Sequence, residues 1–383
     1  MKIGIVTLIG EHNYGNLLQS YALQTVLEQM GHNVVILNRR YSKPNLKLRI
    51  VRVMSFIKSI IRRYILGNKK ILIVNPFVEN YCIKDRIDHS ELEKFVRNYL
   101  KRTLPLCSTD EMKNYARREQ LDAYIVGSDQ VWREKYVFSI EEMFLSFLPN
   151  NSKVKRIAYA ASFGTDNKPI SIGKLSVCRN LLNQFDLISV REQSAVNICK
   201  KQFSVEAIHV LDPTMLLKKD DYIGIFEHAR IPKSKGSLLI YILDDNEEIN
   251  YEIGQVAQTF NMVPFSVNAL EIIESISYSY RKPSVESWLR GFYDAELVIT
   301  DSFHACVFSI IFNKPFVCLG NKDRGNTRFE SLLCMFGLED RIVNERTIKN
   351  ILNNPIDWLK VNGILEQKRI EAKLFLEKAL KKH

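Results

Sequence analysis

Residues 297–317 read LVITDSFHACVFSIIFNKPFV, and they give the clearest indication of the fold class. The first four are apolar or β-branched, as in a strand that is buried on both faces. Asp301 and Ser302 favour a helix N-cap, and residues 305–312 are apolar enough for a helix buried on most sides. The stretch therefore predicts a strand followed at once by a helix, which is the repeating unit of parallel α/β proteins.

His304 is expected in the first turn of that helix. Backbone N–H groups and the positive end of the helix dipole point outward there, so the position suits an anionic ligand. An imidazole exchanges protons near neutral pH, which makes His304 a candidate acid or base. The alternative is a hydrogen-bonded core histidine, which is the commoner situation for an isolated histidine beside an apolar helix.

Strands and helices alternate along the rest of the chain. Further strands are expected at residues 2–8, 34–37, 123–126, 156–160, 187–190, 238–243, 263–267 and 316–319, and helices at 15–30, 90–100, 110–120 and 364–382. The chain has 383 residues, 46% of them hydrophobic, which is enough for two cores. We expect an α/β fold with one domain over residues 1–215 and a second over 237–360. Part of their connection is expected at 218–236, and a last helix within 361–383 is expected to pack across both domains.

The seven cysteines are scattered and form no Cys-x-x-Cys pair, which argues against a disulfide framework and a zinc site. We therefore expect a reducing, cytoplasmic setting and no bound metal. The apolar run at residues 3–9 is too short for a signal peptide and is typical of a first strand. No apolar run approaches the roughly 18 to 20 residues that cross a bilayer.

The formal net charge is +11, and one segment accounts for this excess. Residues 39–70 contain eleven basic residues and no acidic one, and apolar residues at positions 50, 53, 54, 57, 60, 61 and 64 share one face of a helix. Such a basic amphipathic helix favours docking on an anionic membrane surface through residues 50–64, at the inner face of the plasma membrane. The alternative is a helix that packs on its own domain. Nucleic acid is not expected as a partner, because aromatic residues do not interleave with the charges.

Charged residues follow several of the expected strands, where loops at the carboxyl edge of a sheet line a cleft. Arg191 comes directly after the strand at 187–190 and suits a bidentate grip on a carboxylate or phosphate. Arg324 and Arg328 follow the strand at 316–319. Arginines that converge with His304 on one ligand would suit a small dianion or trianion. A surface ion pair is the alternative for each arginine.

Two further loops contain candidate residues. The loop GEHNYGN at residues 10–16 matches neither G-x-G-x-x-G nor a P-loop, although Gly15 permits close backbone approach and Asn16 is a candidate cap. An ordinary turn explains this loop equally well. Asp129 and Trp132, after the strand at 123–126, are candidates for holding a sugar by hydrogen bonding and ring stacking. A tryptophan is, however, more often part of a core.

Taken in order, several segments resemble the polysaccharide pyruvyl transferase family. They are HNYGNLLQSYALQTVLEQMGH near the start, DAYIVGSDQVW, RIAYAASFG, DLISVREQSAV, VLDPTMLL, LVITDSFHACVFSIIFNKPFV and RFESLL. The resemblance implies a GT-B-like pair of Rossmann-like domains with the active site in the cleft between them. It also implies transfer of a pyruvyl group from phosphoenolpyruvate to two hydroxyls of a sugar as a ketal, in the synthesis of capsule or exopolysaccharide. Phosphoenolpyruvate is then the donor substrate and no cofactor is needed, and the acceptor is a sugar or a lipid-linked oligosaccharide.

The same resemblance assigns roles to individual residues. His304 of DSFHA and Arg191 of SVRE match positions expected to transfer protons or bind phosphoenolpyruvate, and Arg328, Gly15 and Asn16 match the pattern less closely. From their positions after strands alone, Arg324 is a further candidate for binding phosphoenolpyruvate, and the residues expected to contact substrate also include Asp129, Trp132, Asp301 and Ser302. Two other interpretations stay open, namely a GT-B glycosyltransferase that uses a nucleotide sugar and a sugar-binding accessory subunit without catalysis. The basic insertion at 39–70 lies outside the resemblance.

Overall fold

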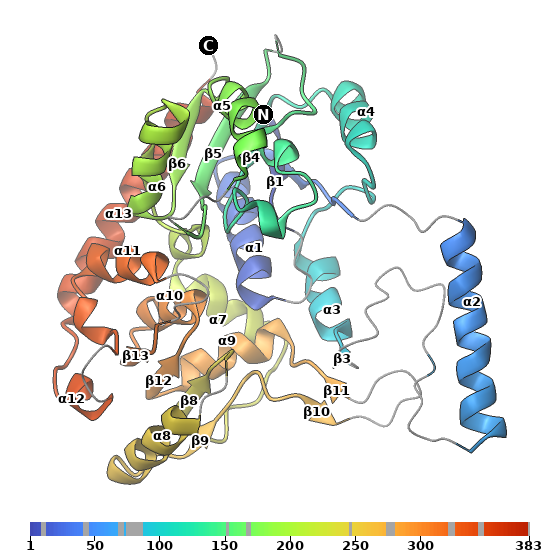
Figure 1. Cartoon of the computed structure of the whole chain (residues 1–383). Helices are drawn as coiled ribbons and strands as arrows, with labels where there is room; N and C mark the ends of the chain where they lie inside the picture. The colour runs from blue at the N-terminus through green and yellow to red at the C-terminus, as the bar shows by residue number, and fades with distance from the viewer. Residues whose placement is uncertain are drawn as a thin grey trace.

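The chain folds around two parallel β-sheets that lie one above the other (Figure 1). The computed structural model describes residues 1–8, 13–40, 46–67, 73, 87–150, 153–165, 170–244, 247–272, 280–320, 326–343 and 348–381. The first sheet contains β1 (Lys2–Val6), β2 (Asn33–Ile36), β4 (Ala123–Val126), β5 (Lys155–Ala161), β6 (Leu187–Val190) and β7 (Ile208–His209), in the order β2-β1-β4-β5-β6-β7. All of its strand pairs are parallel, as the alternating pattern predicted.

Helices cover both faces of this sheet. Its apolar side chains fall into two core clusters, one shared with α1 (Tyr14–Gln29) and α3 (Ser90–Tyr99), and the other with α4 (Thr109–Glu119), α5 (Ile172–Leu182) and α6 (Gln193–Ile198). A sheet that is buried on both faces needs apolar residues at consecutive positions. The run Ala-Tyr-Ile-Val of β4 meets this need, since all four of its residues are buried.

The second sheet contains β8 (Leu238–Tyr241), β9 (Pro264–Phe265), β12 (Leu297–Thr300) and β13 (Phe316–Cys318), in the parallel order β13-β12-β8-β9. One face packs on α9 (Val285–Asp294), α10 (Phe303–Ile311) and α11 (Thr327–Phe336), and the other on α8 (Glu247–Thr259) and α12 (Ile348–Leu352). The strand expected at 263–267 is shorter than predicted. The helix after β12 begins two residues earlier than predicted, so His304 does lie in its first turn.

The two halves share one continuous core. Side chains of α1 and α3 belong to the same cluster as side chains of α9 and α10 from the second half. The tract at 218–236 contains α7 (Lys219–His228), which packs on α9. The last helix, α13 (Trp358–Leu380), contacts β5 of the first half and α11 of the second. Its Arg369 donates hydrogen bonds to the carbonyl oxygens of Met215 and Leu217.

A small third sheet, which the sequence did not predict, also joins the halves. It consists of β10 (Glu271–Ile272), β11 (Tyr280–Arg281) and β3 (Ile87–Asp88), and Nε of Arg281 donates to the carboxylate of Asp88 at 3.2 Å. Short helical turns complete the described chain at Glu134–Tyr136, Glu141–Phe144, Cys199–Phe203, Pro213–Leu216 and Glu339–Arg341.

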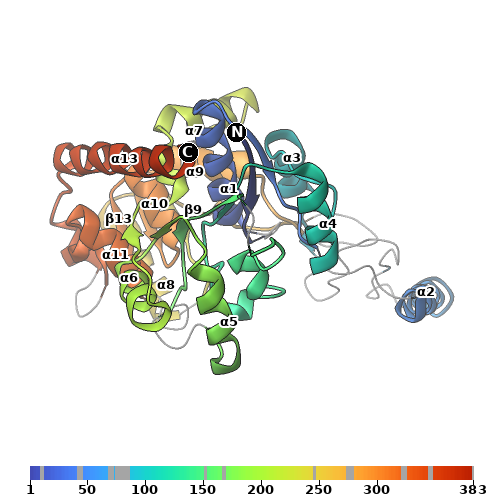
Figure 2. The ribbon, with the colours of Figure 1, turned by 90° about the horizontal axis from the view of Figure 1, so that it is seen from above.

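Helix α2 (Leu46–Ile60) continues into a π-helical turn at Ile61–Ile65, and both stand apart from the two sheets (Figures 1 and 2). The expected helix in the basic insertion is thus present. Within the described chain, no helix is both long and apolar enough to cross a membrane.

The strand order of each sheet contains one topological switch point. In the first sheet the chain runs from β1 outward to β2 and then returns to β4 on the other side of β1; in the second it runs from β8 to β9 and returns to β12. Open α/β sheets bind ligands at such switch points, outside the carboxyl ends of the strands. The fold therefore directs attention to the residues that follow β1, β4, β8 and β12.

Candidate functional site

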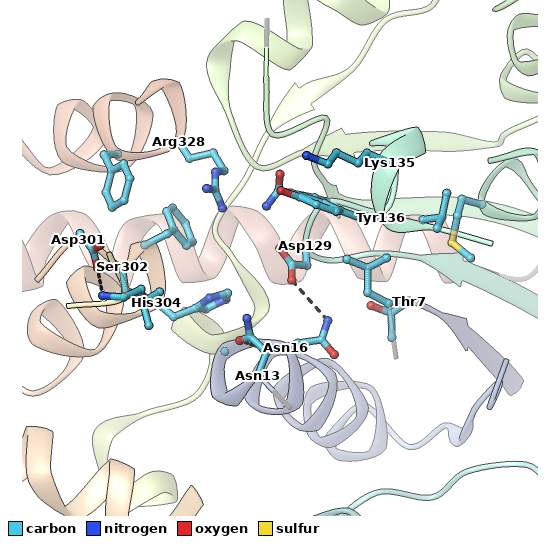
Figure 3. A pocket seen from close by; sticks show the side chains of 18 of the residues that line it. Thr7, Asn13, Asn16, Asp129, Lys135, Tyr136, Asp301, Ser302, His304 and Arg328 are labelled. Atoms are coloured by element: carbon cyan, nitrogen blue, oxygen red, sulfur yellow. Dashed lines mark hydrogen bonds between the residues drawn. The ribbon is translucent and has the colours of Figure 1, made fainter. Parts of the chain in front are cut away.

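A pocket of about 490 Å³ lies where the two switch points face each other. Thr7 and Asp129 reach it from the ends of β1 and β4, and Tyr241 and Asp301 from the ends of β8 and β12. Two helix N-termini also open into it, since Asn13 and Gly15 of α1 and Ser302 and His304 of α10 are in its lining (Figure 3). Helix N-termini present backbone N–H groups and a positive dipole end, so this part of the pocket favours an anion.

His304 crosses from the second half to contact the first. Its ring packs against the backbone of Gly15, and a Cβ atom built on residue 15 would lie 2.1 Å from Nδ1 of His304. Only glycine leaves that space. The sequence analysis expected Gly15 to permit close approach to its backbone, and the group that approaches it is the side chain of His304. Nε2 of His304 lies 3.7 Å from a carboxylate oxygen of Asp212.

Asp212 is a buried carboxylate that the sequence analysis did not select. It accepts hydrogen bonds from Nη1 of Arg191 at 2.8 Å, from Oγ1 of Thr214 at 2.7 Å and from Oγ of Ser128 at 3.3 Å. Burial alone would raise the pKa of Asp212, but His304 and Arg191 beside it hold that pKa well below its usual range. Asp212 is therefore a permanent negative charge beneath His304. Its position in the segment VLDPTMLL was the one signal that could have identified it.

Arg191 lies behind the pocket wall and is not part of the lining. Its guanidinium donates to Asp212 and, through Nη2 at 3.1 Å, to Asp129, and its side chain is 1% exposed. Burial would raise the pKa of Asp129, but Arg191 and then His304 lower it. Arg191 thus fixes both carboxylates in this arrangement.

Arg328 does line the pocket, from the first turn of α11. Burial lowers its pKa to about 10, with a further contribution from the positive charge of Arg191. The guanidinium carbons of Arg191 and Arg328 lie 4.5 and 6.0 Å from the ring centroid of Phe303. Of Arg191 and Arg328, Arg328 is the one that faces the cavity, together with His304 (Figure 3), and convergence of two arginines with His304 on one ligand stays a prediction.

Other predicted residues hold the loops around the pocket. Asn16 is buried, and its Nδ2 donates to Asp129 at 3.4 Å, while the cap of α1 is Asn13, not Asn16. The carboxylate of Asp301 accepts from the backbone N–H groups of Leu243 and Asp244 at 2.8 and 3.0 Å, which joins the loops after β8 and β12. Ser302 occupies the N-cap position of α10, but its side chain makes no capping hydrogen bond.

Trp132 does not serve as a stacking surface for a sugar. Its ring is fully buried and stacks on Phe144 at a centroid distance of 5.2 Å, and its Nε1 donates to the carbonyl oxygen of Met143. The prediction for Trp132 was therefore wrong, and the core interpretation holds. The aromatic residues that line the cavity from the same segment are Tyr136 and Phe138, which are 44% and 41% exposed.

Lys135 lies next to Tyr136, on the side of the pocket opposite Asp301 and Ser302 (Figure 3). Arg324 and residues 10–12 of the first loop fall outside the described residues. In the part of the chain that the structure covers, no group of three His, Cys, Asp or Glu side chains is placed to share a metal ion. The described cysteines are all free thiols.

The pocket therefore has two chemically different parts. One contains two helix N-termini, Arg328 and His304, and can hold an anion beside a group that transfers protons. The other contains exposed aromatic rings and Lys135, and offers flat apolar surface with polar groups around it. Cavities in which aromatic surface combines with a few fixed polar groups are typical of small-molecule sites.

Solved structures of similar architecture are sugar-nucleotide enzymes. A protein assigned as a UDP-N-acetylglucosamine 2-epimerase from Listeria monocytogenes matches with a TM-score of 0.53 and 11% identity, over 98% of this chain and 95% of its own. The UDP-GlcNAc 2-epimerase of Methanocaldococcus jannaschii matches with a TM-score of 0.50 and 12% identity, over 93% of both chains. At this identity the likeness concerns the fold, and it confirms the GT-B-like arrangement of two Rossmann-like sheets.

No curated protein matches the sequence at a significant level. A family model does match, over residues 13–323, which is most of the chain and includes α1, Asp129, Arg191, Asp212 and His304. The chain thus belongs to the polysaccharide pyruvyl transferase family.

Proposed function

We infer that this protein transfers the pyruvyl group of phosphoenolpyruvate to two hydroxyls of a sugar, forming a ketal, in the synthesis of a bacterial capsule or exopolysaccharide. The observation that carries the proposal is the meeting of two helix N-termini, Arg328 and His304 at one end of the pocket. Phosphoenolpyruvate carries a carboxylate and a phosphate on the same carbon atom, and both need positive partners. Membership of the pyruvyl transferase family supports the same assignment.

The anionic end of the pocket is suited to the donor. Arg328 can hold one anionic group bidentately, and the N–H groups at the starts of α1 and α10 can hold the other. The N–H groups and the guanidinium are already in place before phosphoenolpyruvate binds. They therefore offset its negative charge without reorganising. Arg191, one layer behind, holds the carboxylates of Asp129 and Asp212 in place through its bonds to them.

The reaction needs one group that can give and take protons. In the proposed first step, His304 in its imidazolium form delivers a proton to the methylene carbon while a sugar hydroxyl attacks the adjacent carbon. That hydroxyl loses its proton, which restores the acid. In the second step a neighbouring hydroxyl attacks the same carbon, the bond to phosphate breaks, and the proton of this hydroxyl leaves with the phosphate. Asp212, at 3.7 Å, stabilises the imidazolium between these transfers.

The aromatic end of the pocket is suited to the acceptor. Tyr136 and Phe138 present ring surface to the cavity, and the carboxylate of Asp129 can accept a hydrogen bond from a sugar hydroxyl. We favour a lipid-linked oligosaccharide at the inner face of the plasma membrane as the acceptor, because it would place the substrate beside the basic helix at residues 50–64. The protein is then cytoplasmic and peripheral, with phosphoenolpyruvate as its only small donor.

Thermal unfolding with candidate donors tests the proposal first. Phosphoenolpyruvate should raise the melting temperature of the wild type and have much less effect on Arg328→Gln, since only ligands bound by the folded state stabilise it. His304→Gln should keep the shift and lose turnover, which is followed as phosphate release that depends on a sugar acceptor.

Two results would contradict the proposal. A shift with nucleotide sugars alone would favour a GT-B glycosyltransferase. The absence of a shift with any donor, combined with binding of an oligosaccharide, would favour a non-catalytic accessory subunit.

A further inference from the structure

Helix α2 and the turn that continues it carry a row of exposed apolar side chains. Ile50, Met54, Ile57, Ile61 and Tyr64 are spaced by four, three, four and three residues, so they share one face, and each is between 41% and 62% exposed. We call these five residues the α2 stripe. Apolar residues that are exposed singly are ordinary, but a continuous row of this length marks an interaction surface.

The α2 stripe does not pack on the rest of the described protein. None of its residues belongs to any of the core clusters built from the two sheets and their helices. Both views show α2 standing apart from these layers (Figures 1 and 2). Among the residues that the structure describes, the α2 stripe thus shows no sign of packing on its own domain, the alternative left open by the sequence.

The charges around the α2 stripe indicate which kind of surface it binds. Residues 39–70 contain eleven basic residues and no acidic one. Lys58 and Arg62 are exposed close to the stripe, as are the apolar Ile65 and Leu66 at 75% and 70%. A second copy of this helix would bring like charges together without acidic residues to pair with them, whereas helical pairs normally rely on opposite charges beside the apolar row. An anionic lipid surface complements both features, because it accepts apolar side chains and attracts basic ones.

We propose that residues 50–66 dock this protein on an anionic membrane surface. The α2 stripe enters the boundary between headgroups and acyl chains, and the basic side chains contact the headgroups. Each basic residue near such a surface strengthens binding by about fivefold at physiological salt. The helix lies in the plane of the membrane and does not cross it.

Docking also has a consequence for the pocket. Arg39, the first residue of the basic insertion, lines the pocket and donates from Nε to Glu142 at 2.8 Å. The chain therefore runs directly from the wall of the site into the segment that leads to α2. The link between docking and the pocket rests on the proposed function, because it matters only if the acceptor is carried by a lipid. Docking itself does not depend on the reaction.

Vesicle flotation with the full chain tests the proposal in the absence of any substrate. Wild type should float with vesicles of phosphatidylcholine and phosphatidylglycerol, bind phosphatidylcholine vesicles much more weakly, and detach as salt is raised. The double variant Met54→Glu, Ile57→Glu should lose flotation. Lys58→Gln and Arg62→Gln should each weaken binding by about fivefold.

The chain offers a matched control. Ile172 on α5 is 80% exposed, so Ile172→Glu makes the same chemical change on another helix and should leave flotation unchanged. Melting temperatures should be equal for all of these variants, since the changed side chains lie at the surface. Wild type that fails to float with anionic vesicles overturns the proposal. So does a wild-type dimer in light scattering that the double variant dissociates, because the stripe would then bind a second copy.

Discussion

Asp212 and His304 face each other across the boundary between the two halves of the chain, with 3.7 Å between the carboxylate oxygen and Nε2. The carboxylate belongs to the segment after β7, and the imidazole to the first turn of α10 after β12. Neither half contains both groups. This pairing of an imidazole with a permanent negative charge exists only when the halves are assembled.

Replacing Asp212 by Asn tests this pairing. The amide keeps the size of the side chain but removes the charge that stabilises the imidazolium and pairs with Arg191. We expect kcat to fall by about 10²-fold, in the range of general acid–base contributions, while the dissociation constant for phosphoenolpyruvate changes little. Stability should fall by about 1–3 kcal/mol, because a buried arginine loses a charged partner. The exposed Asp220→Asn on α7 is the control, and an unchanged kcat in Asp212→Asn would remove Asp212 from the mechanism.

Replacing Gly15 by Ala tests whether the contact with residue 15 positions the ring of His304. The added Cβ would lie 2.1 Å from Nδ1 of His304, so the imidazole must move. Because a displacement of about 1 Å can cost 10²-fold in rate, we expect a fall in kcat of that order. Folding stability should not fall in proportion, since alanine favours the helix. Gly173→Ala on α5 is the matched control, because nothing lies within 4 Å of its Cβ position. Full activity of Gly15→Ala would show that the ring can act from another position.

Two aromatic variants distinguish the hydrophobic core from the proposed acceptor site. Trp132→Phe leaves the carbonyl oxygen of Met143 without its donor and should lower stability by about 1–3 kcal/mol, with an unchanged KM for the acceptor. Tyr136→Ala should leave stability nearly unchanged and raise the acceptor KM by roughly threefold to tenfold, as expected for the loss of one ring contact. Urea unfolding and steady-state kinetics measure both effects. The reverse pattern would restore Trp132 as the sugar platform.

The burial of Lys282 predicts that the stability of the folded protein depends on pH. Burial lowers its pKa from 10.5 to about 8, and its Nζ lies 4.8 Å from the ring centroid of Tyr14. The unfolded chain therefore binds more protons between pH 8 and 10.5, so the contribution of Lys282 to stability rises with pH across that window and is least favourable below it. We expect Lys282→Met to be more stable than wild type by about 1–2 kcal/mol at pH 7, and this gain to shrink towards pH 10.

Urea unfolding at the two pH values measures this gain. The exposed Lys219→Met on α7 should show no comparable gain. Lower stability of Lys282→Met at pH 7 would mean that the contact with Tyr14 outweighs the cost of burial.

The sequence predicted a strand correctly where the residues of that strand alone are enough to identify it. The strands β4, β6 and β12 were predicted with the observed bounds, because each is a short apolar run followed at once by small or polar residues. The third sheet could not be predicted, since it joins Asp88 to Arg281 through strands of two residues that carry no periodicity. Strand β9 is short for a related reason, because only Pro264 and Phe265 pair with β8.

The sequence predicted the position of the candidate site better than the contacts within it. His304 and Arg328 line the pocket, as their positions after strands suggested, but no local pattern reveals which of two aromatic residues in one loop faces a cavity. Trp132 and Tyr136 differ in that respect by the packing of Phe144 and Phe163 around the former. Asp212 was missed because a carboxylate before a proline is typical of a turn, and its burial beside Arg191 is a tertiary fact.

The contact between Gly15 and His304 limits which amino-acid substitutions this protein can accept during evolution. A side chain larger than glycine at position 15 forces the ring at position 304 to move, so the start of the first helix and the DSFHA segment must fit each other. Hybrids that combine the first half of one relative with the second half of another would assemble both sheets and still lack a working site, unless residue 15 and the facing ring fit each other. Under the proposed function, exchange of acceptor preference between relatives is therefore simplest through the segment around Tyr136, which lines the pocket apart from that pair.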